Sequence, residues 1–294
     1  MKRTLKILIG YIIFIFILVS VAVFFPPKVS SIYLSFAILA MGIVAIVCQK
    51  QLHHGMFVEM GFRLNRNAAI GLSIGLLFTA IVLILNFWLP VRLGLIEIVL
   101  NENSPAVSKE VSLMLTVSII VVLGGIIMFI ACLFGEELAF RGYILPKLEE
   151  IFGGVKAIIL CSVIFGLWHL PAYFSIYSGG AAEQGWTSVA VMLLAHGISV
   201  VPVCILYLTT RELYGVSLYH ALVDVFQYSI VANPAMGEIS KDAIYRMEIL
   251  NEPVMEIVGW GWQILAIFIM LGLCRLVKNV VISYNIPATS TVNK

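Results

Sequence analysis

The chain has 294 residues, of which 61% are hydrophobic and only 12% are charged. So few polar side chains cannot cover the surface of a water-soluble globule of this size, which excludes a soluble domain and predicts a protein embedded in lipid. The formal net charge of +2 gives no indication of a nucleic-acid partner.

Eight apolar runs are long enough to cross about 30 Å of hydrocarbon at about 1.5 Å per helical residue. We therefore predict an all-α, polytopic membrane protein of about eight transmembrane helices. The whole chain, 1–294, is expected to form a single integral membrane domain, because no internal repeat, low-complexity tract or soluble linker is visible. The predicted spans cover residues 7–25, 32–49, 69–90, 112–134, 156–174, 187–209, 213–231 and 256–276.

The distribution of positive charge predicts the orientation of these spans. With the N-terminus in the cytoplasm, eight crossings place most of the 18 Lys and Arg residues in inside segments, as the positive-inside rule requires. We expect a multi-pass protein of the cell membrane with both termini cytoplasmic. The acidic outside segment 232–255 is expected to be a solvated amphipathic loop.

The five cysteines all fall within or at the ends of the apolar runs, without the close pairing of a disulfide framework or zinc knuckle. We expect them to be buried, small hydrophobic side chains.

Ionisable side chains inside the spans are expensive, so each needs a partner, a water-filled cavity or a function. Six candidates stand out, and a seventh candidate of lower rank is a histidine that we expect to serve as an interhelical hydrogen-bonding group. The six are Glu136, Glu137, Arg141, His169, His220 and Asp224, and the seventh is His196.

Helical geometry separates the two adjacent glutamates. Residues four apart lie nearly in line, so Glu137 is expected over Arg141 as a structural ion pair. Glu136 points elsewhere on the helix and remains free to take or give a proton.

Position along the chain predicts that the remaining groups meet. Glu136 and His169 lie about equally far from a helix-hairpin turn at 152–154, although Pro146 is expected to start a short separate helix between them. His220 lies at a similar depth in its own span, and Asp224 is one turn further on the same face. These side chains should converge on one cavity within the bundle that opens to the cytoplasm, with Phe165 and Trp168 packing around His169.

In this order and spacing, the motifs resemble the CAAX protease and bacteriocin-processing (CPBP, Abi) family of intramembrane glutamic endopeptidases, the type II CAAX prenyl endopeptidases among them. Its Glu-Glu-x-x-x-Arg motif is matched at Glu136 to Arg141, its Phe-x-x-x-His at Phe165 and His169, and its His-x-x-x-Asn/Asp at His220 and Asp224. The resemblance covers about 115–231, the expected peptidase core.

The resemblance implies a catalytic role for four residues. Glu136 and His169 would activate a water molecule that attacks a peptide carbonyl, and His220 and Asp224 would stabilise the oxyanion. An ionised Asp cannot donate a hydrogen bond, so Asp224 would have to be protonated, orient His220, or act in another way. Glu137 and Arg141 would be supporting residues, and no cofactor is expected.

Several alternatives stay open. Zinc held by the same Glu and His side chains is a second enzymatic version, although the chain has no His-Glu-x-x-His. A non-catalytic immunity or peptide-binding protein is a third, and a proton-relaying transporter a fourth. The expected partners are membrane lipid and a hydrophobic or lipidated peptide, either a prenylated C-terminal peptide or a bacteriocin precursor.

Overall fold

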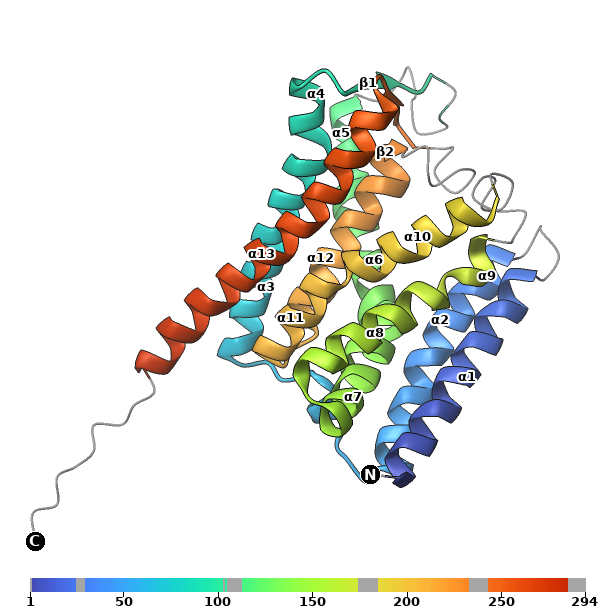
Figure 1. Cartoon of the computed structure of the whole chain (residues 1–294), viewed down its shortest axis with the longest axis vertical. Coiled ribbons are helices and arrows are strands. Elements are labelled where there is room, and N and C mark those ends of the chain that lie inside the picture. The colour runs from blue at the N-terminus through green and yellow to red at the C-terminus, as the bar shows by residue number, and fades with distance from the viewer. Residues whose placement is uncertain are drawn as a thin grey trace, which may run out of the picture.

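The computed structural model describes residues 2–24, 30–102, 104, 113–173, 185–232 and 243–284. Helices dominate, and they pack as a bundle with a small sheet at one end (Figure 1). In the first part of the chain the elements are α1 (Lys2–Phe24), α2 (Ser30–Val47), the π-helical turn η1 (Cys48–Leu52), the 3₁₀ turn η2 (Phe57–Met60), α3 (Arg66–Leu83), the π-helical η3 (Ile84–Trp88), α4 (Leu89–Arg92) and β1 (Ile96–Leu100).

The second part of the chain carries the polar motifs. Its elements are α5 (Leu113–Ile119), the π-helical η4 (Ile120–Gly124), α6 (Gly125–Cys132), the π-helical η5 (Leu133–Ile144), α7 (Leu145–Phe152), α8 (Gly154–Trp168), α9 (Leu170–Tyr173), α10 (Trp186–Ser199), α11 (Val201–Thr210), α12 (Tyr214–Val225), the π-helical η6 (Phe226–Ile230), β2 (Val231–Ala232), β3 (Tyr245–Ile249) and α13 (Glu252–Tyr284).

Within the described residues, seven helices are long and apolar enough to cross a membrane. They confirm the all-α, polytopic architecture and correspond to seven of the eight predicted spans. The remaining predicted span, 213–231, is helical through α12 and η6 but is shorter than the others. The five cysteines are free and buried, as predicted.

Helix α1 illustrates how the bundle faces lipid. Its buried residues recur every three or four positions, as at Leu8, Tyr11 and Ile15, and form one stripe against the neighbouring helices. Ile13 and Ile17 point away from this stripe and are 54% and 56% exposed. Such large exposed apolar side chains are compatible with surrounding lipid. The stripe of buried residues identifies the side of the helix that faces the protein.

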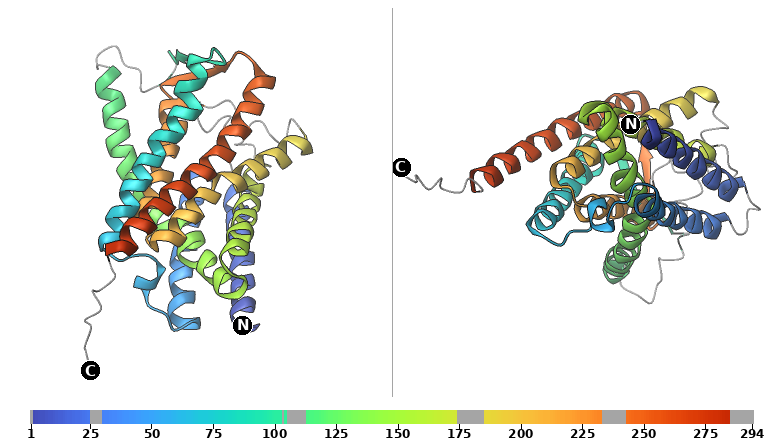
Figure 2. Two further views of the ribbon diagram at one scale, coloured as in Figure 1. Left: turned by 60° about the vertical axis from the view of Figure 1, so that its left-hand side comes forward. Right: turned by 90° about the horizontal axis from the view of Figure 1, so that it is seen from below.

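The two ends of the bundle differ. The start of α1 and the far end of α13 lie toward the same end, whereas the three strands lie at the other (Figure 1). Seven spanning helices together with the shorter α12–η6 segment account for this arrangement. Helix α13 crosses the bundle obliquely and leans away from it at its C-terminal end (Figure 2).

The strands correct the expectation of a solvated loop at 232–255. Strand β3 pairs antiparallel with β1 and parallel with β2, giving the order β1-β3-β2. Alternate residues of β1 and β3 turn inward, and Ile96 and Met247 pack in an apolar cluster with Phe87 and Ile230. The two-residue alternation of β3 is short and includes charged residues, so the acidic segment gave no clear prediction of a strand. The residues 233–242 of the expected loop lie outside the described part of the chain.

Pro146 lies at the start of a short helix, α7, as expected, but α7 is not separated from the helix before it. Residues Leu115–Phe152 form one continuous helical run. Pro146 lies in the first turn of α7, where the π-helical stretch η5 ends. Because the residues before Pro146 are already helical, the proline removes one backbone hydrogen bond from this run, at the point where π-helical bonding changes to α-helical bonding.

Helices α3 and α12 cross at a contact made of glycines. A Cβ atom on Gly75 would meet the backbone carbonyl of Gly215, and one on Gly215 would meet the backbone of Gly71. Small residues let membrane helices approach this closely. The contact fixes α12, which carries His220 and Asp224.

We expect Gly215→Ala to lower the free energy of unfolding by about 1–3 kcal/mol, because the added methyl group overpacks a backbone contact. Denaturant titration in detergent micelles measures the change. Gly259→Ala is the matched control, because a Cβ atom there has no neighbour within 4 Å in the described part of the chain. Equal effects of the two variants would contradict the proposed close contact.

Candidate active site

The paired glutamates lie on a π-helical segment, η5, that was expected to be α-helical. In a π-helix the backbone hydrogen bonds join residues five apart, which widens the helix, and such segments often occur at functional sites. Helix α2 packs closely against η5, and a Cβ atom on Gly42 would meet the Phe134 carbonyl. Close backbone packing against α2 therefore holds the segment.

Glu137 and Arg141 form the predicted ion pair. Arg141 Nη1 donates to Glu137 Oε1 at 3.1 Å, and the exposed fractions of the two side chains are 0% for Arg141 and 1% for Glu137. The Arg141 guanidinium also lies over the Phe165 ring, 4.7 Å from its centroid, in a cation–π arrangement. The pair therefore connects η5 to α8.

Glu137 has a second partner that the sequence did not reveal. His220 Nδ1 donates to Glu137 Oε1 at 2.6 Å. The two residues are 83 positions apart, so no local spacing could predict the contact. Glu137 thus fixes the ring of His220 as well as the guanidinium of Arg141.

Glu136 also faces His220, which corrects part of the sequence interpretation. Its Oε2 lies 3.8 Å from His220 Nε2, the ring nitrogen opposite the one that Glu137 holds. Glu136 is thus separate from the Glu137–Arg141 pair, as predicted. Both carboxylates nevertheless approach the same imidazole.

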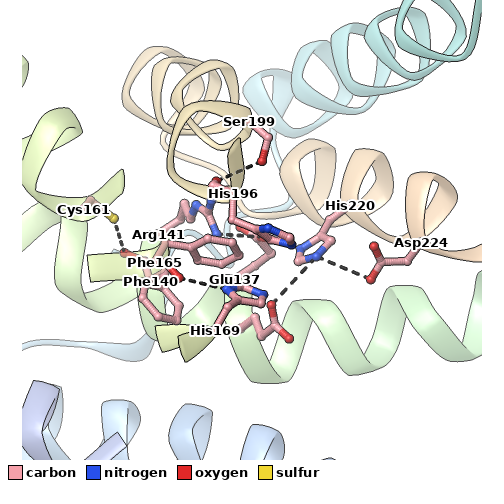
Figure 3. Close-up of polar contacts among 11 residues, drawn as sticks. Glu137, Phe140, Arg141, Cys161, Phe165, His169, His196, Ser199, His220 and Asp224 are labelled. Carbon is pink, nitrogen blue, oxygen red and sulfur yellow. Dashed lines mark hydrogen bonds and ion pairs between the residues drawn. The ribbon is translucent and has the colours of Figure 1, made fainter. Parts of the chain in front are cut away.

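Asp224 is the third carboxylate beside His220. Its Oδ2 lies 3.5 Å from His220 Nε2, one helical turn along α12. Figure 3 shows Glu137 and Asp224 approaching the His220 ring from different sides. Among the roles left open for Asp224, this contact favours orienting His220.

His169 lies at the break between α8 and α9, shortly before Pro171. Its Nδ1 donates to the Phe165 carbonyl at 2.9 Å. That hydrogen bond selects the tautomer in which Nε2 carries the lone pair. The Phe165 and Trp168 rings pack beside the imidazole, with centroids 4.8 Å from it in each case, as expected.

His196 joins the same group from α10. Its Nδ1 lies 2.6 Å from Tyr173 Oη and 3.1 Å from the Met192 carbonyl. The bond to Tyr173 of α9 confirms the expected interhelical hydrogen bond. The His196 ring also lies 4.4 Å from the His169 ring, centroid to centroid, and Figure 3 shows it beside His220.

All seven polar candidates line one cavity of about 220 Å³ inside the bundle. The predicted convergence is therefore confirmed. The structure brings together residues from η5, the end of α8, α10 and α12, which are separated by up to 88 positions along the chain. Besides Glu136, Glu137, Arg141, His169, His196, His220 and Asp224, the cavity is lined by polar side chains that the sequence analysis did not select, among them Asn86, Ser199, Gln227, Tyr228 and Gln263.

A candidate metal-ligand group lies at the edge of this site. One ligand atom each from Cys132, His220 and Asp224 fall within 4.8 Å of one another. This set differs from the Glu136, His169 and His220 set that the zinc hypothesis assumed. Thiolate, imidazole and carboxylate are all zinc ligands. The separation is slightly wide for Zn–ligand bonds of about 2.0–2.3 Å, so these side chains would have to draw together around an ion.

Comparison with known families agrees with this geometry. Residues 111–226 match the family described as type II CAAX prenyl endopeptidase Rce1-like. The matched segment is thus similar to that family over somewhat more than a third of the chain. It contains all six principal site residues and coincides closely with the peptidase core expected at 115–231. No curated protein matches the chain.

The match to this Rce1-like family supports a membrane-embedded peptide hydrolase at the level of the family. The matched segment holds the three polar motifs, whereas α3, η3 and α13, which complete the cavity, lie outside it. The family core therefore does not enclose the site by itself.

The buried ion pair can be tested through the stability of the protein. Arg141→Met leaves Glu137 as a buried charge without its cation, so we expect the free energy of unfolding to fall by about 3–5 kcal/mol. Combining it with Glu137→Gln should lower the free energy by clearly less than the sum of the two single changes. Denaturant titration of the four proteins in detergent measures the coupling, and strictly additive losses would contradict a direct pair.

Proposed function

We propose that this protein is an intramembrane endopeptidase that uses Glu136 and His169 to activate water against a peptide carbonyl. The proposed substrate is a membrane-anchored, hydrophobic peptide, of which prenylated CAAX-type C-termini are the favoured class and bacteriocin-like peptides the second. The observation that carries the proposal is the shared cavity, which Glu136, His169 and His220 of the Rce1-like segment all line.

In this proposal His169 Nε2 acts with Glu136 on the water molecule. The hydrogen bond from Nδ1 to the Phe165 carbonyl leaves Nε2 able to accept a proton. The water oxygen bonds to the carbonyl carbon, its proton passes to Glu136 or His169, and the same proton is then given to the departing amine as the C–N bond breaks.

The oxyanion of the tetrahedral intermediate needs a hydrogen-bond donor, and His220 is the proposed one. Its ring is held at Nδ1 by Glu137, so Nε2 is directed toward Glu136 and Asp224. In this role Nε2 carries a hydrogen, and Asp224 orients the ring as an acceptor until the oxyanion forms. This assignment removes the need for Asp224 itself to donate.

Cleavage of a lipidated reporter peptide by the purified full-length protein in detergent tests the proposal. We expect Glu136→Gln and His169→Ala each to lower kcat by about 100-fold or more, because each removes a group that moves the proton. Ile264→Met, on the lipid-exposed surface of α13, is the control and should keep its activity; the Ile264 side chain is 53% exposed.

A chelator separates the two enzymatic versions. Full activity in a strong chelator supports the metal-free proposal. Loss of activity that zinc restores would support metal catalysis, and Cys132→Ser should then weaken zinc binding measured directly by titration. A wild-type protein that binds but never cleaves several classes of peptide would instead support an immunity or peptide-binding function.

We also propose that both termini lie in the cytoplasm, because most Lys and Arg residues then fall on the inside. In a background without native cysteines, Lys50→Cys should react with a membrane-impermeant thiol reagent only from the cytoplasmic side, and Arg92→Cys only from the other side. Both side chains are exposed; Lys50 lies in η1, which follows α2, and Arg92 ends α4, which follows α3. The reverse pattern of labelling would overturn the orientation.

A further inference from the structure

A second group of polar side chains lines the catalytic cavity. It consists of three carboxamides, which we call the carboxamide group: Asn86 from η3, Gln227 from η6 and Gln263 from α13. Trp262, next to Gln263, lines the cavity as well. All four lie outside the matched segment 111–226, so the catalytic motifs do not explain them.

Carboxamides on membrane helices need hydrogen-bonding partners, because an unpaired polar group in hydrocarbon costs several kcal/mol. Asn86 uses its own helix, where Nδ2 donates to the Val82 carbonyl at 2.8 Å. Gln263 Oε1 and Trp262 Nε1 are buried and have no hydrogen-bond partner among the described residues. The acceptor of Gln263 and the donor of Trp262 are thus both available for hydrogen bonding at neighbouring positions of the cavity wall.

We propose that the carboxamide group, with Trp262, binds the main chain of an extended substrate peptide beside the scissile bond. This inference rests on the proposed endopeptidase function. A carboxamide carries the same donor and acceptor groups as a peptide unit, so it can pair with main-chain N–H and C=O groups whatever the side chains are. In a cavity surrounded by lipid, the peptide main chain needs such pairing as much as the wall does.

The rest of the wall suits the side chains of the same peptide. Phe78, Val82, Leu85 and Ala266 lie among the carboxamide group on α3, η3 and α13 and are apolar. An extended peptide with apolar residues would place its side chains against these positions and its amides against the carboxamides. Helices α3 and α13 would then select substrate, while η5, α8 and α12 carry out the chemistry.

Binding to an inactive protein tests this subsite without turnover. A fluorescent lipidated peptide is titrated against full-length Glu136→Gln protein in detergent. Adding Gln263→Met, which keeps the side-chain length, should raise the Kd about 3- to 10-fold, the loss expected from one hydrogen bond of roughly 0.5–1.5 kcal/mol. Gln227→Met, on another helix, should have an effect of similar size, and the control Ile264→Met should leave the Kd within about twofold.

A series of peptides, each with one N-methylated amide, identifies the contact. The peptide that lacks the N–H bound by Gln263 should lose no further affinity when Gln263→Met is added, whereas the other peptides should still lose about 3- to 10-fold. Unchanged Kd values for both Gln variants, or equal losses for every methylated peptide, would overturn the subsite.

Failure of the subsite can be distinguished from failure of the proposed peptidase function. Peptide cleavage by the wild type with no coupling to Gln263 or Gln227 rejects only the subsite. Coupled binding without cleavage by the wild type rejects only the peptidase. Absence of both cleavage and binding rejects the two together.

Discussion

The site depends on one buried carboxylate, that of Glu137. Its Oε1 accepts from Arg141 at 3.1 Å and from His220 at 2.6 Å, so it joins η5 to α12, and through the Arg141–Phe165 contact also to α8. Charged groups taken out of water are tolerated only when they are paired with good geometry. The requirement to pair Glu137 therefore fixes the three helices in one arrangement, and the catalytic side chains follow.

A bilayer makes this arrangement more demanding than it would be in water. Outer helix faces are covered by exposed Ile, Leu, Val and Phe side chains, whereas the centre holds a polar cavity of about 220 Å³. Hydrolysis needs water at a depth where lipid provides none, and polar walls are what keep water in such a cavity. The aromatic packing around His169 and the glycine contact between α3 and α12 hold the cavity walls in place.

The Rce1-like segment and the flanking helices contribute different groups to the cavity. Residues 111–226 supply the groups that can move protons, but η3, η6 and α13 close the cavity around them. A proteolytic site has to hold a peptide as well as attack it. The carboxamide group supplies that second requirement in our proposal, and it would allow proteins with the same core to select different substrates through their flanking helices.

The sequence by itself determined the membrane architecture, most of the helix positions, the Glu137–Arg141 pair and the identity of the side chains that meet in the cavity. These properties follow from hydropathy, helical spacing and the cost of charge in lipid, all of which are local. Tertiary structure alone decided that both glutamates face His220, that η5 is π-helical, that β1 pairs with β3, and that Asn86 and Gln263 line the cavity. Each of these depends on contacts between segments far apart in the chain, and isolated Asn or Gln residues carry no spacing pattern by which a sequence could mark them.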